Sequence, residues 1–179
     1  TTNYNETKNS VVNAQFVDIP VVIDGMSSEV SSYGSKEKKP FELSATQKRG
    51  VAFLIQKGSG LVAWGVGVGK TFGIATATVA QIQYGRAKRP VMVVPRSTIN
   101  QTWIHSFQQA FPGVGLVNLQ GMTADVVRRM KAERGEPKDW VKDGEIAIVS
   151  HEGLMRLGFT EDELRSLTGD MQDALWQEA

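Results

Sequence analysis

The stretch from Gly65 to Thr71 constrains this 179-residue chain more than any other feature, because its residue types suit one local structure. It follows the apolar run Leu61–Trp64 and precedes an Ala- and Ile-rich segment. Glycines let a backbone curl so that successive N–H groups point at one anion, and the start of a following helix adds partial positive charge. The sequence therefore predicts a strand, a phosphate-binding loop and a helix, in that order.

Lys70 and Thr71 are the candidate catalytic residues of this loop. The lysine amine can reach the β- and γ-phosphates of a nucleoside triphosphate, and the Thr71 hydroxyl can ligate Mg²⁺. A dinucleotide-binding fingerprint fits less well, because Lys70 occupies its third glycine position. Trp64 stands where the general phosphate-loop pattern expects glycine. The predicted cofactor-binding positions in the loop are Gly65, Val66, Gly67, Val68, Gly69, Lys70 and Thr71.

From residue 41 to residue 159 the chain alternates short apolar runs with segments of helical spacing. The predicted strands are Leu61–Trp64, Val91–Val94, Leu116–Leu119 and Ile146–Val149. The predicted helices are Leu43–Gln56, Thr71–Tyr84, Thr98–Phe111 and Ala124–Glu133. Continuous apolar strands that alternate with helices indicate a parallel sheet covered on both faces. We therefore predict a three-layer α/β lobe with a mostly parallel central sheet.

The two flanks differ from this body. Residues 1–40 are rich in Ser, Asn and Thr, which favours an N-terminal extension or linker. Within it, the apolar patch Phe16–Ile23 is interpreted as a strand or a clip onto the body, and the polar run Ser27–Lys39 as a linker. Residues 160–179 are interpreted as an acidic helical tail.

Composition excludes several classes of site. The chain has no cysteine, so disulfides, thiolate zinc sites and cysteine nucleophiles are excluded. The net charge of +1 neither requires nor excludes a nucleic-acid partner. No apolar stretch approaches the ~20 residues that a membrane helix needs, and no secretory signal pattern opens the chain. We expect no membrane partner and a cytoplasmic protein, or a nuclear one if the source is eukaryotic.

Four blocks of sequence follow one another between residues 43 and 157. They contain a glutamine, the glycine-rich loop, a Pro-Arg-Ser turn and an apolar strand ending in Ser-His-Glu, and they span Leu43–Val51, Trp64–Thr71, Val93–Phe107 and Ile146–Leu154. Together they resemble the first RecA-like lobe of superfamily-two helicases, most closely the Swi/Snf-type translocase branch. The resemblance implies a RecA-like P-loop NTPase lobe that binds ATP, Mg²⁺ and DNA, with RNA a weaker expectation.

The resemblance also implies roles for single residues. Gln47 would recognise adenine through its amide, which can both donate and accept hydrogen bonds. The loops after the later strands would contact the nucleic-acid backbone without reading its sequence. The residues implied for that contact are Arg96, Ser97, Thr98, Ser150 and His151.

Other side chains of these segments are given structural roles. Trp103 and Phe107, four residues apart, are expected to anchor their helix to the sheet rather than to stack on bases. The basic stretch Arg128, Arg129, Lys131 and Arg134 is interpreted as a solvated helix face, with a phosphate-binding patch as the alternative.

Two parts of the family pattern are missing. The chain lacks the strand with an acidic pair that would hold Mg²⁺ and orient the attacking water, and it lacks a second RecA-like lobe. The acidic cluster Glu161–Glu163 is interpreted as a charge on the first turn of a helix. We expect a fragment whose parent hydrolyses ATP, whereas the fragment alone binds nucleotide weakly without turnover.

One alternative function stays open, and a second is disfavoured. A degenerate P-loop lobe could act as a non-hydrolysing DNA-binding or scaffold module, which the replacement of the family's acidic pair by Trp64-Gly65 favours. A metabolic P-loop kinase is disfavoured, because the Pro95–Phe107 and Ser150–Leu154 blocks would have no role there.

Overall fold

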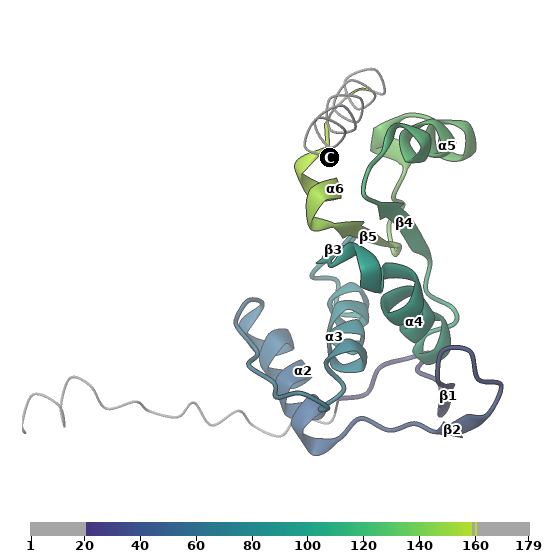
Figure 1. Cartoon of the computed structure of the whole chain (residues 1–179). Coiled ribbons are helices and arrows are strands. Elements are labelled where there is room, and N and C mark those ends of the chain that lie inside the picture. The colour runs from purple at the N-terminus through teal and green to yellow at the C-terminus, as the bar shows by residue number, and fades with distance from the viewer. Residues whose placement is uncertain (1–20, 159, 161–179) are drawn as a thin grey trace, which may run out of the picture.

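The computed structural model describes residues 21–158 and residue 160. Its centre is a three-stranded sheet in the order β3-β5-β4, formed by Val91–Val94, Ile146–Ser150 and Leu116–Gln120, and both strand pairs are parallel (Figure 1). All five residues of β5 are buried, as expected of a central parallel strand. The three strands predicted at these positions are confirmed.

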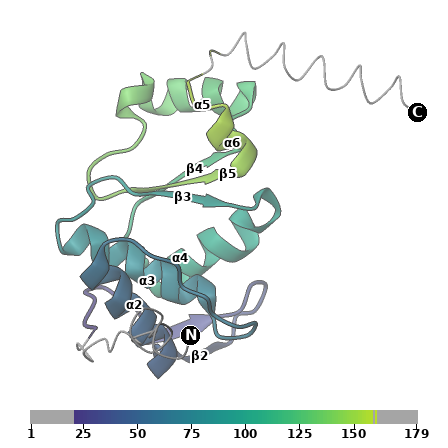
Figure 2. The ribbon, with the colours of Figure 1, turned by 90° about the vertical axis from the view of Figure 1, so that its left-hand side faces the viewer.

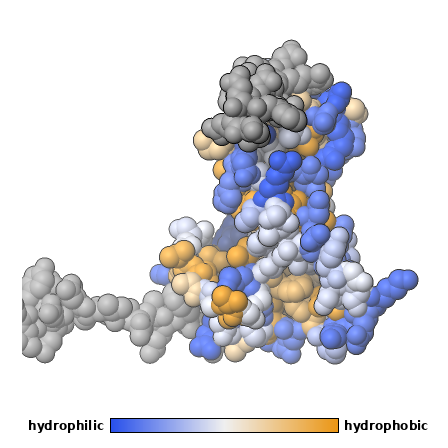
Figure 3. Space-filling model, viewed as in Figure 1, coloured by the Kyte–Doolittle hydropathy of each residue, from blue (hydrophilic) through white to orange (hydrophobic). Residues whose placement is uncertain are grey.

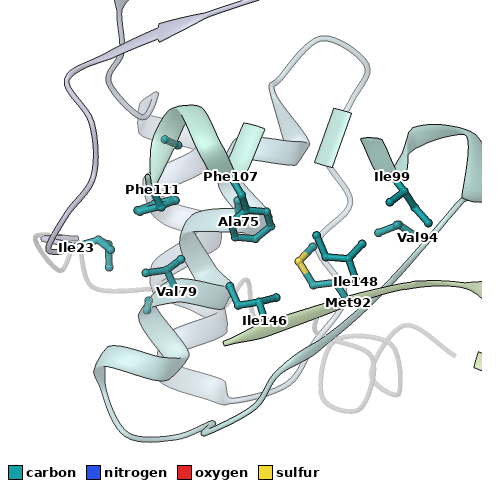
Figure 4. Packing of buried hydrophobic residues seen from close by; sticks show 12 residues of the cluster. Ile23, Ala75, Val79, Met92, Val94, Ile99, Phe107, Phe111, Ile146 and Ile148 are labelled. Atoms are coloured by element: carbon teal, nitrogen blue, oxygen red, sulfur yellow. The ribbon is translucent and has the colours of Figure 1, made fainter. Parts of the chain in front are cut away.

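Helices cover both faces of the sheet (Figure 2). Because side chains alternate along a strand, Ile146 and Ile148 of β5 point to one face and Ala147 and Val149 to the other. The first pair joins the hydrophobic cluster with α3 (Lys70–Gln83) and α4 (His105–Ala110) that Figure 4 shows. The second pair packs with α5 (Ala124–Arg134) and the buried Trp140. The prediction of a mixed α/β fold with a parallel sheet flanked by helices is confirmed.

The first described helix, α2 (Ala45–Lys57), packs against α3 rather than on the sheet. It begins at a capping box, in which Ser44 and Gln47 each satisfy a main-chain N–H of the other. It ends at Gly58, whose left-handed φ of 75° favours glycine. A bond from the Gln81 side chain of α3 to the Leu54 carbonyl, 3.1 Å long, joins the two helices.

The helix predicted over Thr98–Phe111 is a chain of three helical types. It consists of a 3₁₀ turn η1 (Arg96–Thr98), a π-helical segment η2 (Ile99–Ile104) and α4. Phe107 is fully buried and Trp103 packs on the same cluster, so the predicted anchoring role of both side chains is confirmed. On the other face, a short 3₁₀ turn η3 (Pro137–Asp139) follows α5, and α6 (His151–Met155) follows β5.

The strand predicted at Leu61–Trp64 is wrong. These four residues form no strand, and the Leu61 side chain is 89% exposed. An extended segment needs a neighbouring strand for its main-chain hydrogen bonds, and this one instead lies beside the helices α2 and α3. Figure 3 shows hydrophobic surface over α2 and the segment that follows it.

A hairpin that the sequence did not predict lies within residues 27–40. Strands β1 (Glu29–Ser31) and β2 (Lys38–Pro40) pair antiparallel, and the hairpin contacts α4. His105 Nε2 lies 2.9 Å from the Ser31 carbonyl, and the Ser31 N–H donates to Gln109 Oε1 at 3.1 Å. The polar run interpreted as a linker is therefore attached to the body.

Other predictions for the flanks are tested only in part. Ile23 is buried in the main cluster, and Val21 packs against it, which supports the interpretation of the apolar patch as a clip. Val22, between them, is exposed. Residues 16–20 of the patch, and residues 161–179 of the helical tail expected over residues 160–179 with its acidic cluster, lie outside the described residues. Within the described part of the chain, no helix has both the length and the apolar character needed to cross a membrane.

Candidate functional site

The glycine-rich loop curls in front of α3 without support from a strand. Gly67 and Gly69 have φ values of 83° and 77°, in the left-handed region that other residues avoid. Gly69 is also the N-cap of α3, so the loop leads directly into the first turn of that helix. The first N–H groups of a helix have no partners within it, and they are directed toward the loop.

The Lys70 side chain reaches back across the loop to its beginning. Its amine donates to the Trp64 carbonyl at 3.0 Å and to the Gly65 carbonyl at 2.6 Å. Thr71 lies half-buried in the first turn of α3. A curled main chain, a lysine amine, a helix N-terminus and a hydroxyl therefore occupy one site, and this donor set fits a triphosphate with its magnesium ion.

Gln47 fastens α2 to the end of this loop. Its side chain is 6% exposed, and both ends of its amide have partners within the chain. The Oε1 atom accepts from the Ser44 N–H at 2.7 Å, and the Nε2 atom donates to the Gly69 carbonyl at 2.9 Å. An adenine contact by Gln47 would use the second N–H of its amide nitrogen or the second lone pair of Oε1, and it stays a prediction.

Trp64 occupies a gap between the two helices beside the loop. A Cβ atom added to Gly50 of α2 would lie 2.1 Å from its indole, and one added to Gly73 of α3 would lie 2.4 Å away. Neither glycine has a positive φ, so space and not backbone conformation accounts for them. A glycine inside a helix lowers helix stability by about 1 kcal/mol relative to alanine. Here Gly50 and Gly73 together leave the space that the Trp64 ring occupies.

The glycine-rich loop and the carboxyl ends of the strands lie at the same end of the molecule. Phe72, in the first turn of α3, shares a cavity with Gln101 and Thr102, which follow β3. Near the other end of α3, Gln81 shares a cavity with Val91, the first residue of β3. The helix thus runs antiparallel to the strands. In sheets of this kind, ligands bind outside the carboxyl ends of the strands.

The residues after β3 present one basic side chain at that end. Arg96 and Ser97 are exposed, whereas Thr98 is half-buried and its hydroxyl donates to the Pro95 carbonyl at 2.8 Å. Thr98 occupies the N-cap position of η2, but its side chain makes no capping bond. Of the three residues predicted to contact nucleic acid here, Arg96 and Ser97 are accessible.

Of the two residues predicted to contact nucleic acid at the end of β5, one is buried and the other is exposed. The Ser150 side chain is fully buried and accepts from the Gly153 N–H at 3.0 Å, which caps α6. His151 is exposed beside it. The hydrogen bond from Ser150 is the main cause that lowers the pKa of Glu152, and the charges of His151 and Arg96 add to it. Arg96 and His151 therefore both lie near enough to Glu152 to act on its carboxylate.

Sequence reasoning missed Arg156, which lies outside the four blocks. Its Nη1 atom donates to the Gly121 carbonyl at 3.4 Å, and the Arg96 guanidinium lies over Gly121 as well. On either side of Gly121, Gln120 and Met122 have positive φ values of 47° and 50°, which are strained for residues with side chains. Such strain gathers at functional sites and supports a binding surface at this edge.

The basic stretch of α5 is mostly engaged within the chain. Arg128 pairs with Asp125, and Arg129 donates to the Asn118 carbonyl at 3.0 Å. Arg134 pairs with Glu145 at 2.7 Å. These contacts favour the interpretation of the stretch as a helix face and speak against the alternative of a phosphate-binding patch.

Among residues 21–158 and 160, no cluster of three or more His, Cys, Asp or Glu side chains could hold a metal ion. Neither a protein-family model nor a curated protein matches the chain.

Proposed function

We propose that the chain is the nucleotide-binding N-terminal lobe, RecA-like in fold, of an ATP-dependent DNA helicase or translocase of the Swi/Snf-like type. The observation that carries this proposal is the coincidence of two sites at one end of a parallel sheet. A glycine-rich loop, curled at Gly67 and Gly69, opens α3 there, and the exposed Arg96 and His151 follow the strands.

In the proposed nucleotide site, the loop N–H groups and the Lys70 amine bind the β- and γ-phosphates. The amine exchanges its two carbonyl partners for phosphate oxygens, which form stronger, charge-assisted hydrogen bonds. Thr71 contributes its hydroxyl to the bound magnesium ion, which supplies positive charge to the phosphates. Gln47 keeps the loop end against α2.

In the proposed nucleic-acid site, basic side chains and a hydroxyl contact the DNA backbone. Arg96, His151 and Arg156 gather around the ends of β3, β5 and β4, and Ser97 adds a hydroxyl. Ser150 acts through the α6 cap that positions His151, because its own side chain is buried. Contacts of this kind give affinity that depends on salt and little on base sequence.

The nucleotide site is tested by calorimetric titration of the protein with ATP and Mg²⁺. We expect wild-type protein to bind, and Lys70→Ala to weaken binding by at least about tenfold, because a charge-assisted bond to phosphate is worth ~1.5–3 kcal/mol. The matched control is Lys57→Ala, which removes an exposed lysine from the last turn of α2. Equal affinities of the wild-type and Lys70→Ala proteins would contradict the proposal.

A second candidate is a lobe that binds nucleotide and DNA without hydrolysis. It is favoured by the strand ends, since the described strands of the parallel sheet run into Pro95, Gly121 and His151 and not into a pair of carboxylates. Phosphate release from ATP in the presence of DNA separates the two candidates. Sustained release that Lys70→Ala abolishes would favour the motor, and binding without release would favour the scaffold.

A further inference from the structure

The phosphate loop has to be held at both of its ends if its N–H groups are to converge on one anion. Its far end is fixed, because Gly69 caps α3 and its carbonyl accepts from Gln47. Its near end follows Leu61–Trp64, which forms no strand, so no main-chain ladder sets its position. The near end therefore depends on side-chain contacts.

The Trp64 indole makes those contacts. It lies between Gly50 and Gly73, at distances that leave no space for a methyl group on either helix. Gly73 belongs to the first turns of α3, where its N–H bonds to the Gly69 carbonyl at 3.2 Å. One ring thus links the start of the loop to the helix that begins at its end.

The same residue bears on the lysine. The Trp64 carbonyl is one of the two acceptors of the Lys70 amine, at 3.0 Å. The position of the indole therefore decides where the loop begins, and with it where the amine is held. A second aromatic ring fixes the preceding residues in the same manner. A Cβ atom added to Gly60 would lie 2.3 Å from the Phe53 ring.

We propose that Trp64 is a positioning residue for the phosphate loop: the indole seated between Gly50 and Gly73 holds the loop in the shape that receives a magnesium-bound triphosphate, in place of a β-strand. This inference rests on the proposed nucleotide-binding function and adds to it a determinant of phosphate affinity. It implies that the position of the Trp64 indole affects binding of the phosphates and not of the base.

The test measures dissociation constants of Mg-ATP and of inorganic magnesium tripolyphosphate, together with the midpoint of urea unfolding. Trp64→Ala removes the ring, Trp64→Phe leaves a smaller one, and Gly73→Ala displaces the ring without removing it. We expect Trp64→Ala and Gly73→Ala to weaken both ligands by the same factor, about tenfold or more, with Trp64→Phe intermediate.

Two controls separate positioning from folding. Gly113→Ala is the matched glycine change, because Gly113 has no positive φ and no atom within 4 Å of an added Cβ. Trp140→Phe alters a buried tryptophan on the other face of the sheet. We expect both to keep wild-type affinities, although Trp140→Phe lowers the unfolding midpoint.

Each contrary result is distinct. Wild-type affinities in Trp64→Phe and Gly73→Ala would overturn the inference while the Lys70 result still stood. A loss for ATP alone, with tripolyphosphate unaffected, would overturn it by assigning Trp64 to the base. Affinity that falls in Trp140→Phe in step with stability would reduce Trp64 to a folding residue. Wild-type protein that binds neither ligand would contradict the proposed function itself.

Discussion

The central sheet and the segment of residues 58–69 before α3 both contain short apolar runs, yet different interactions hold them in place. Val91–Val94 and Ile146–Ser150 are paired by parallel main-chain ladders and packed between helices. Leu61–Trp64 has no ladder, and two aromatic rings seated on glycines position it and Gly60 just before it. Main-chain hydrogen bonds to a neighbouring strand fix a whole strand, whereas an aromatic ring packed against a glycine fixes one point of the chain. The difference explains how the glycine-rich loop can keep its shape outside the sheet.

The largest expected effect comes from the centre of the sheet. Ile148→Ala should lower the free energy of unfolding by about 2–5 kcal/mol, because it leaves a cavity at a fully buried position. Urea unfolding followed by circular dichroism measures this loss. A change below about 1 kcal/mol would mean that the sheet is not the more tightly packed of the two regions.

A smaller effect is expected at the start of β5, where Glu145 pairs with Arg134. Burial alone would raise the pKa of Glu145, but the hydrogen bonds from Arg134 and from the Lys142 N–H outweigh it and lower the pKa below its usual 4.5. The carboxylate therefore stabilises the fold above the unfolded-state pKa, and this contribution is lost as pH falls through the folded-state pKa.

Glu145→Gln should accordingly cost about 1–3 kcal/mol at pH 7, and the difference from wild type should vanish at strongly acidic pH. Unfolding curves recorded across the acidic range measure it. Glu133→Gln, at an exposed glutamate of α5, is the matched control and should leave stability unchanged. A difference that persists below pH 3 would speak against the ion pair as its cause.

At the strand ends the expected effect is on binding and not on folding. Arg96→Ala should weaken binding of duplex DNA for all sequences alike and should reduce the slope of log affinity against log salt by roughly 0.9. Fluorescence anisotropy at several salt concentrations measures both. Arg86→Ala removes an exposed arginine at the opposite end of the sheet and should change neither quantity. An unchanged slope in Arg96→Ala would remove Arg96 from the proposed surface.

The smallest effect is expected in the segment before α3. Leu61→Ala should change stability by less than about 0.5 kcal/mol, because the side chain is 89% exposed. The same unfolding assay applies. A loss comparable to that of Ile148→Ala would show that Leu61 is buried in solution, and the contrast between the two regions would fail.

The sequence predicted the sheet well, because buried parallel strands leave continuous apolar runs. It failed at Leu61–Trp64, because an apolar run does not reveal whether a neighbouring strand is present. It also missed the hairpin of residues 29–40, which is polar and depends on the distant His105 and Gln109.

Prediction of the site was similarly divided. The glycine curl follows from residue types alone, and the left-handed φ at Gly67 and Gly69 agrees with it. Ser44-x-x-Gln47 is a capping-box pattern that could have indicated an internal partner for the Gln47 amide. The seat of Trp64 between Gly50 and Gly73 could not have been found, because it depends on how α2 and α3 pack.

The two carbonyl contacts of Lys70 have a consequence for ligand choice. The resting loop already satisfies its own cation, so an incoming anion must compete with the chain and cannot simply fill a vacant charge. A singly charged ion such as chloride offers one weak contact in exchange for two. A polyphosphate offers several oxygens and the helix start besides, and we expect this competition to make the loop discriminate by charge density before any base is recognised.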